Sequence, residues 1–356
     1  MNIFTFGINH KTAPIEIREK FFLNPIQQDL LLSELKSDPS IVETFVLSTC
    51  NRTEIYLHTV SDFFIPEQLL KRIVDIKKIT FEKSYMQYFY SHKQDLALRH
   101  LLSVTSGLDS LVLGEKQIIG QVKTAVDRAR EKGMFGRYFN ILTNIAIRTA
   151  KKAQTETQIS YGGSSVSWAA ITMAEKSLQT LEGKSILVIG AGKMGDLALT
   201  QLKNKGVKSI YLMNRTGQAA QELAEKYSAI AVSFMDIKEV LSEIDVCVCA
   251  SSAPHYILDR NTIEKILTLR HNRPLILLDI SMPRNIDPEI STLNNVSLYH
   301  IDDLKKVLDE NMSKRENAVQ LVEAMIDRQL VFFYEKLNRL QSDPKEKNSF
   351  ESIETP

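Results

Sequence analysis

The pattern of hydrophobic residues along the chain changes near residue 160. In residues 185–280, short runs that are apolar at nearly every position alternate with segments of helical periodicity. Such runs are typical of strands covered on both faces, and their alternation with helices is typical of a parallel sheet with helical crossovers. The clearest predicted strands are residues 185–189, 209–213, 245–250 and 275–279.

The region before residue 160 predicts a smaller α/β unit followed by helices. Residues 2–9 form a predicted strand, and a helix is expected over residues 25–36. Two further strands are expected at residues 41–47 and 55–59, because both segments are rich in β-branched and aromatic residues. From residue 94 the pattern is mostly helical and is interrupted by glycines.

The segment from Asp302 to Ser342 contains neither glycine nor proline and predicts one long helix of about 60 Å, at about 1.5 Å per residue. Its apolar residues crowd together at positions 330–337, whereas residues 309–317 are almost wholly polar. This pattern favours a spine that leans on other domains, or a helix that pairs with a second copy. With a break at Gly162-Gly163, the predicted domains are residues 1–160, 161–300 and 301–356.

Composition and charge narrow the classes of function. The chain has 356 residues and a formal net charge of +1, so no global field marks a nucleic-acid binder. Basic residues outnumber acidic ones in residues 123–152, which fits either a phosphate-contacting face or a solvated helix face. The sequence shows no signal peptide and no apolar run long enough for a membrane helix. We expect a cytoplasmic protein without a membrane partner.

The three cysteines are Cys50, Cys247 and Cys249, a count that does not indicate a disulfide framework. Cys247 and Cys249 lie in a predicted buried strand. Cys50 lies between two predicted strands, and a nearby cation such as Arg52 favours the nucleophilic thiolate form. Arg52 could instead hold a carboxylate in a bidentate fork. From these residues alone, a nucleophile and a small buried cysteine in a turn are equally good interpretations.

A glycine-rich segment follows the predicted strand 185–189 and opens a predicted helix. Its sequence, G-x-G-x-x-G, allows the backbone to approach a pyrophosphate at a helix N-terminus. The next predicted strand ends in an arginine, where an NAD site usually has an acid, and a guanidinium suits the 2′-phosphate of NADP. The predicted cofactor is therefore NADPH, and the predicted cofactor-binding residues are Gly190, Ala191, Gly192, Lys193, Met194, Gly195, Asn214, Arg215 and Thr216. We predict no metal site.

A nucleophilic thiol and NADPH in one chain indicate reduction through a thioester. The thiolate would attack an activated acyl group, and hydride would then reduce the thioester to an aldehyde. The nicotinamide must approach the acyl-Cys50, so we expect the cleft between the two domains to close.

Several segments resemble the glutamyl-tRNA reductase family. The most specific are those around Cys50 and from Gly107 to Glu115. The resemblance spans about residues 7 to 310, and the matching segments are 7–14, 48–56, 107–115, 117–123, 155–157, 190–195, 214–216 and 279–284.

This resemblance implies an α/β protein with an N-terminal α/β catalytic domain, a Rossmann-type NADPH-binding domain and a long C-terminal spinal helix, assembled as a V-shaped homodimer. It implies NADPH-dependent reduction of glutamyl-tRNA to glutamate-1-semialdehyde, the first step of tetrapyrrole biosynthesis, with glutamate-1-semialdehyde aminomutase as a candidate product acceptor. It assigns Cys50 as the nucleophile and His100 as a second catalytic residue. The implied substrate-binding residues are Thr49, Asn51, Arg52, Ser110, Glu115, Lys116, Gln117 and Gln121.

Two departures from the family pattern stand out. Lys116 replaces the proline that is usual in the family's Gly-Glu-Pro-Gln segment, and the chain ends before the additional C-terminal helices that usually serve dimerisation. Structural roles also remain open for three residues: His100 lies on an apolar helix face, Ser110 in a predicted turn and Gln121 on a predicted helix surface.

Two other classes of function fit parts of the sequence. A shikimate-dehydrogenase-like NADP oxidoreductase would account for the glycine-rich segment but not for Cys50. A non-enzymatic dinucleotide- or tRNA-binding protein would bind ligand without forming an acyl-Cys50. Mass spectrometry of the chain mixed with glutamyl-tRNA in the absence of NADPH separates these alternatives, because only the reductase forms a glutamyl adduct.

Overall fold

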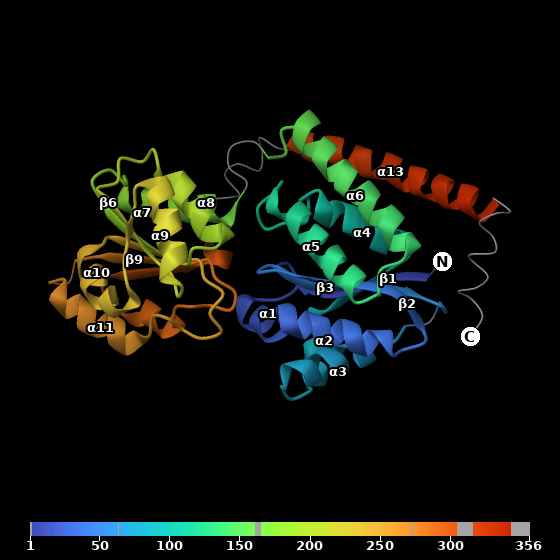
Figure 1. Cartoon of the computed structure of the whole chain (residues 1–356), viewed down its shortest axis with the longest axis horizontal. Helices are drawn as coiled ribbons and strands as arrows, with labels where there is room; N and C mark the ends of the chain where they lie inside the picture. The colour runs from blue at the N-terminus through green and yellow to red at the C-terminus, as the bar shows by residue number, and fades with distance from the viewer. Residues whose placement is uncertain (1, 63, 161–164, 272, 305–315, 343–356) are drawn as a thin grey trace. The chain divides into compact units, whose positions relative to one another are not determined.

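The computed structural model describes residues 2–62, 64–160, 165–271, 273–304 and 316–342 (Figure 1). The chain divides into two compact units. Unit 1 comprises residues 1–162 together with residues 313–356, and unit 2 comprises residues 163–312. The C-terminal helix therefore groups with the N-terminal residues, whereas the sequence predicted residues 301–356 as a region of their own.

Unit 1 is built on a four-stranded antiparallel sheet with the strand order β2-β3-β1-β4. Strand β3 lies inside the sheet, and all of its residues are buried. Phe45 of β2 stacks on Tyr56 of β3 with 4.6 Å between ring centroids, as expected for aromatic cross-strand neighbours. The strands are β1 (Asn2–Asn9), β2 (Ile41–Ser48), β3 (Arg52–Thr59) and β4 (Tyr90–Lys93).

Helices cover both faces of this sheet, with α1–α3 on one face and α4–α6 on the other (Figure 1). Helix α2 begins where the sequence predicts it, at Pro25, and Asn24 and Gln27 form a reciprocal capping box there. The elements are α1 (Ile15–Phe21), α2 (Pro25–Lys36), α3 (Pro66–Lys77), the 3-10 helix η1 (Lys83–Tyr88), α4 (Asp95–Thr105), α5 (Gln117–Glu131) and α6 (Arg137–Glu156).

Unit 2 has the parallel sheet that the sequence predicts. Its strand order is β7-β6-β5-β8-β9-β10, so the direction of the strand order reverses between β5 and β8. This is the doubly wound Rossmann arrangement, in which a dinucleotide binds at the carboxyl ends of the strands beside the reversal. The strands are β5 (Ser185–Ile189), β6 (Ser209–Met213), β7 (Ile230–Ala231), β8 (Val246–Cys249), β9 (Leu275–Asp279) and β10 (Val296–His300).

The helices of unit 2 lie on both sides of its sheet (Figure 1). Cys247 and Cys249 point into the core from β8 and are fully buried, as predicted. The helical elements are α7 (Val166–Leu178), α8 (Lys193–Leu202), α9 (Gly217–Tyr227), η2 (Phe234–Asp236), α10 (Ile237–Glu243), α11 (Arg260–Leu269), η3 (Pro288–Thr292) and η4 (Ile301–Leu304).

The long C-terminal helix α13 runs from Glu316 to Ser342 and packs against α4 and α6 of unit 1 (Figure 1). The sequence predicted one helix from Asp302 to Ser342, but residues 301–304 form the 3-10 helix η4 instead of the start of that helix. Residues 305–315 of the predicted helix lie outside the described residues. The buried stripe of α13 consists of Ala318, Val322, Ile326, Phe333 and Leu337.

This packing changes the interpretation of the crowded apolar residues 330–337. Phe333 and Leu337 are buried within unit 1, whereas Val331 and Phe332 remain exposed. Much of the surface that the sequence pattern offered to a second copy is therefore covered by the chain's own helices. No described helix has both the length and the apolar character needed to cross a membrane.

Two adjacent phenylalanines of α13 test this packing. Phe333→Ala removes a side chain with no exposure and should destabilise unit 1 by about 3–5 kcal/mol. Phe332→Ala, at a position that is 44% exposed, should cost less than about 1 kcal/mol. Hydrogen exchange of the α4 and α6 amides measures unit 1, and fluorescence of the only tryptophan, Trp168 in α7, monitors unit 2 as the control. Equal effects of the two substitutions would contradict the packing.

Candidate active site

Cys50 lies at the tip of the hairpin that joins β2 to β3. The hairpin is closed by a hydrogen bond of 2.8 Å from the Thr49 amide to the Arg52 carbonyl. Asn51 anchors the tip twice: its amide donates to Thr49 Oγ1 over 3.2 Å, and its carbonyl accepts from the His10 amide over 3.0 Å. The chain after β1 therefore holds the turn in place, and Cys50 as a whole residue is half-buried, although its thiol is surrounded by protein.

The electrostatic environment of Cys50 favours the thiol over the thiolate. Burial, and after it the negative charge of Glu115, raise the pKa of Cys50 to about 12, although the positive charges of Arg18 and Arg52 oppose this shift. The expected effect of Arg52 on the thiolate is thus present, but burial outweighs it. A reaction of Cys50 at neutral pH needs a change in this environment or a group that accepts the proton.

Arg52 is buried and forms two ion pairs. Its guanidinium donates to Glu54 and, over 3.0 Å, to Asp109 Oδ2; it also donates to the Asp109 main-chain carbonyl. Lys11 and the Asn9 side-chain amide also donate to the Asp109 carboxylate. The sequence left two roles open for Arg52: stabilising the Cys50 thiolate or binding a carboxylate. The structure shows carboxylate binding, and the carboxylates are those of Glu54 and Asp109 in the protein itself.

Glu54 is the centre of this network. Its carboxylate is fully buried and accepts hydrogen bonds from Arg52, from Tyr56 Oη at 2.6 Å, from Tyr90 Oη and from His100 Nε2 at 2.9 Å. Burial alone would raise the pKa of Glu54, but Arg52 and His100 bring it well below its usual range. An ionised carboxylate therefore persists inside the core because it has four donors around it.

His100 joins the network from α4. Its ring lies beside those of Tyr90 and His92, with centroid separations of 5.3 Å and 4.9 Å. Its Nε2 atom is held by Glu54. The structure therefore brings His100 together with the hairpin of Cys50 through Glu54, a residue that the sequence analysis did not select as functional.

Three groups of this network, from Glu54, His100 and Asp109, offer ligand atoms within 4.8 Å of one another, a spacing that a metal ion could bridge. Both carboxylates, however, already bind the Arg52 guanidinium. The positive charge that a metal would supply is thus provided by Arg52, and we assign no metal to this cluster.

The other predicted substrate residues follow in the loop after α4 and at the start of α5. Glu115 and Gln117 are buried, Ser110 and Gln121 are half-buried, and Lys116 is exposed. Within the part of the chain that the structure describes, Asn51 Oδ1, Gln117 Nε2 and His10 Nδ1 are buried without a hydrogen-bond partner. Buried polar atoms normally have partners, so these three can receive a polar ligand.

The loop also depends on Gly114, which has a positive φ of 75°. A Cβ atom there would lie 2.1 Å from the Ile159 carbonyl oxygen, so only glycine allows the loop to pack against the segment that follows α6. The sequence analysis missed Glu54, Tyr90 and Asp109. Glu54 and Asp109 lie within the segments that carry the family resemblance, whereas no sequence signal marked Tyr90.

The glycine-rich segment of unit 2 connects β5 to α8. Gly190 has a φ of 113°, and a Cβ atom on it would lie 2.5 Å from the Ala250 carbonyl oxygen. A Cβ atom on Gly195 would lie 2.0 Å from the Gly190 carbonyl oxygen, whereas nothing lies within 4 Å of one on Gly192. The first and third glycines are thus required by close packing, and the second leaves open space at the N-terminus of α8, which fits a pyrophosphate.

The end of β6 lies beside this segment. Asn214 Oδ1 accepts a hydrogen bond of 3.2 Å from the Ala191 amide, and Asn214 Nδ2 donates to the Thr216 carbonyl over 3.1 Å. Arg215 follows directly and is exposed, and its guanidinium has no ion-pair partner among the described residues. The chemistry of these residues fits a dinucleotide, with Arg215 free to meet a phosphate on the ribose.

The carboxyl end of β9 is organised by Asp279. Its buried carboxylate accepts hydrogen bonds from the amides of Ser281, Asn285 and Ile286. Burial raises the pKa of Asp279 to about 6, although these three amides oppose the shift. Asn285 in turn accepts from the Ser251 hydroxyl after β8, so the loops after β8 and β9 are tied together beside the strand-order reversal.

The two units together define a class of protein, the nicotinamide-dependent oxidoreductases. Unit 2 is a doubly wound dinucleotide-binding unit, and unit 1 presents a cysteine beside a buried charge network. Comparisons with known proteins make this specific. Residues 6–157 match the model of the glutamyl-tRNAGlu reductase N-terminal domain, and residues 172–307 match that of shikimate / quinate 5-dehydrogenase. The chain belongs to the glutamyl-tRNA reductase family, as the sequence segments predicted.

Similar proteins cover nearly the whole chain. A glutamyl-tRNA reductase of Thermodesulfovibrio yellowstonii is 39% identical over 97% of this chain and 82% of its own length. One of Priestia megaterium is 38% identical over 96% of this chain and 76% of its own length. The solved structure of glutamyl-tRNA reductase from Methanopyrus kandleri is 31% identical, covers 95% of this chain and 81% of its own, and has a TM-score of 0.51.

The raised pKa of Cys50 predicts how its alkylation depends on pH. Below a pKa of about 12 the thiolate fraction grows about tenfold per pH unit, so the rate of carbamidomethylation by iodoacetamide should rise about a hundredfold from pH 7 to pH 9. Mass spectrometry of the peptide that contains Cys50 measures the rate, and the fully buried Cys247 and Cys249 serve as internal controls. A plateau near pH 7 would show that the pKa is not raised.

Proposed function

We propose that the chain reduces glutamyl-tRNA to glutamate-1-semialdehyde with NADPH, the first step of tetrapyrrole biosynthesis, through a thioester on Cys50. The observation that carries this proposal is the half-buried Cys50 at the hairpin tip, beside buried polar atoms that lack partners. It lies in the region that matches the glutamyl-tRNA reductase N-terminal domain. A shikimate-dehydrogenase-like activity is not favoured, because it leaves this region without a function.

The proposed reaction has two steps. The Cys50 sulfur attacks the carbonyl carbon of the aminoacyl ester; a C–S bond forms, the ester C–O bond breaks, and the tRNA leaves with its terminal hydroxyl protonated. NADPH, when bound at residues 190–195 and 214–216, supplies the hydride that reduces the acyl carbon. The C–S bond then breaks, the aldehyde leaves, and the Cys50 thiolate takes up a proton from water.

Glu115 offers a way to activate Cys50 when the substrate binds. Its negative charge contributes to the raised pKa of the thiol. The α-ammonium group of a bound glutamyl residue near Glu115 would offset this charge and thereby favour the thiolate. Arg52 contributes a second positive charge that Glu54 and Asp109 hold in place. Asn51 and Gln117, whose buried polar atoms lack partners, would bind polar groups of the glutamyl moiety.

The remaining assignments follow from this activity. His100 is a catalytic residue held by Glu54, and Thr49, Ser110, Lys116 and Gln121 complete the substrate contacts. A homodimer, glutamate-1-semialdehyde aminomutase as product acceptor and a cytoplasmic location stay predictions. The exposed Val331 leaves part of α13 for a second copy of the chain.

Substitution of the nucleophile is the direct test of this mechanism. Cys50→Ser should abolish reduction, because a hydroxyl is a far weaker nucleophile than a thiolate, and should leave NADPH binding unchanged. Wild-type chain mixed with glutamyl-tRNA in the absence of NADPH should carry a glutamyl adduct on Cys50 in mass spectrometry. Cys247→Ala, in the core of unit 2, is the matched control and should keep the adduct. Near-normal reduction by Cys50→Ser would refute the mechanism.

Arg215 should determine the preference for NADPH over NADH. Arg215→Ala should weaken binding of NADPH by about 1–3 kcal/mol, the contribution of a charge-assisted hydrogen bond, and should change NADH binding little. Calorimetric titration of both cofactors measures the difference. Lys238→Ala, which removes another exposed cation of unit 2, is the control. Equal losses for both cofactors would contradict the assignment.

A further inference from the structure

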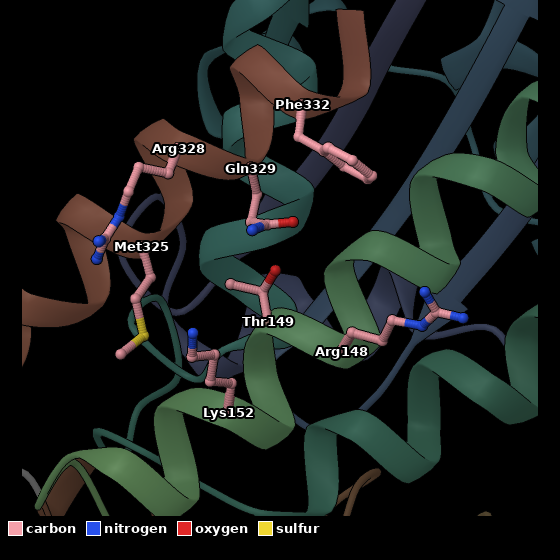
Figure 2. Close-up of a pocket in the computed structure, with 7 residues that line it drawn as sticks. All are labelled: Arg148, Thr149, Lys152, Met325, Arg328, Gln329 and Phe332. Atoms are coloured by element: carbon pink, nitrogen blue, oxygen red, sulfur yellow. The ribbon is translucent and has the colours of Figure 1, made fainter. Parts of the chain in front are cut away.

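A groove runs between α6 and α13 of unit 1, apart from the turn that carries Cys50. Its volume is about 380 Å³, which falls within the range of ligand sites. Figure 2 shows that residues of both helices line it. The lining residues are Arg148, Thr149 and Lys152 of α6 and Met325, Arg328, Gln329 and Phe332 of α13.

The lining of this groove is cationic and contains no carboxylate. Arg148 has no ion-pair partner among the described residues, and Arg328 donates only to the Ala324 carbonyl of its own helix. Lys152 has an exposed partner, Glu156, at 3.7 Å one turn along α6. Such a solvent-exposed pair is worth little and can be exchanged for a stronger anion.

The cations are spread along the groove instead of converging on one point. Figure 2 shows the Arg148 and Arg328 side chains directed toward opposite sides, with Lys152 and Gln329 between the two helices. Arg148 and Lys152 are separated by one helical turn, about 6 Å along the axis of α6. A single phosphate would be bound by converging donors, whereas this arrangement suits successive phosphates of one strand. The half-exposed Phe332 adds an aromatic face at the edge.

We propose that the α6–α13 groove binds the phosphate backbone of the tRNA part of the substrate, away from the reacting ester. This inference rests on the proposed function, because it takes its polyanion from the glutamyl-tRNA substrate. Phosphate contacts position a nucleic acid without reading its sequence. The groove therefore supplies affinity and orientation and leaves the chemistry to the residues around Cys50.

The test is a variant with Arg148→Ala, Lys152→Ala and Arg328→Ala together. All three side chains are exposed, so the fold is retained, as circular dichroism and NADPH binding will verify. Fluorescence anisotropy with uncharged tRNA at several salt concentrations should show at least about tenfold weaker binding near 0.1 M salt and a salt slope smaller by about 2–3. KM for glutamyl-tRNA should rise similarly, with kcat unchanged.

The matched control removes the same charge elsewhere, through Lys71→Ala, Lys83→Ala and Lys238→Ala, and should bind tRNA like the wild type. Equal affinity of the groove variant and the wild type for uncharged tRNA overturns the inference. Displacement of tRNA from the wild type by excess AMP also overturns it, because the groove would then take a single nucleotide. A wild-type chain that forms no glutamyl-Cys50 adduct counts instead against the proposed function.

Discussion

The geometry of the candidate active site depends on one buried ion cluster. Arg52 at the start of β3 is neutralised by Glu54, two residues along the same strand face, and by Asp109 from the loop after α4. Removal of one member of such a cluster leaves an uncompensated buried charge and typically costs about 3–5 kcal/mol. Tyr90 from β4 and His100 from α4 close the cluster on Glu54. Three distant segments are thereby fixed around the hairpin of Cys50.

The ion cluster positions the hairpin of Cys50 but does not by itself make the Cys50 thiol reactive. The cluster holds the hairpin in place, but the two carboxylates, Glu54 and Asp109, offset most of the positive potential of Arg52 at the neighbouring thiol. Burial and Glu115 consequently dominate, and the pKa of Cys50 stays high. A nucleophile that is protonated at rest is protected from oxidation and from unwanted acylation. In the proposed mechanism, the reactivity of Cys50 then depends on the positive charge that a correctly bound substrate brings.

Local signals in the sequence predicted much of this structure. Apolar runs and glycine spacing predicted the Rossmann unit, because the first and third glycines, Gly190 and Gly195, are required by contacts with their own turn or with the end of the adjacent strand. The partners of Arg52 were not predictable in this way, because Asp109 and Tyr90 come close only in the folded sheet. The periodicity of α13 similarly indicated an apolar stripe, but not that α4 and α6 would cover it. The proposed role of Cys50 as the nucleophile rests on family resemblance and not on periodicity.

The chain enters unit 2 after residue 162 and returns to unit 1 only with α13. During translation, the faces of α4 and α6 that pack against Phe333 and Leu337 therefore stay uncovered until more than one hundred further residues have been synthesised. At about 5–20 residues per second, this interval lasts about 10–30 seconds. The nascent N-terminal unit presents exposed apolar surface throughout that time, while the Rossmann unit can already fold. Placing one unit inside the other therefore lengthens the time for which this apolar surface has no partner from its own chain.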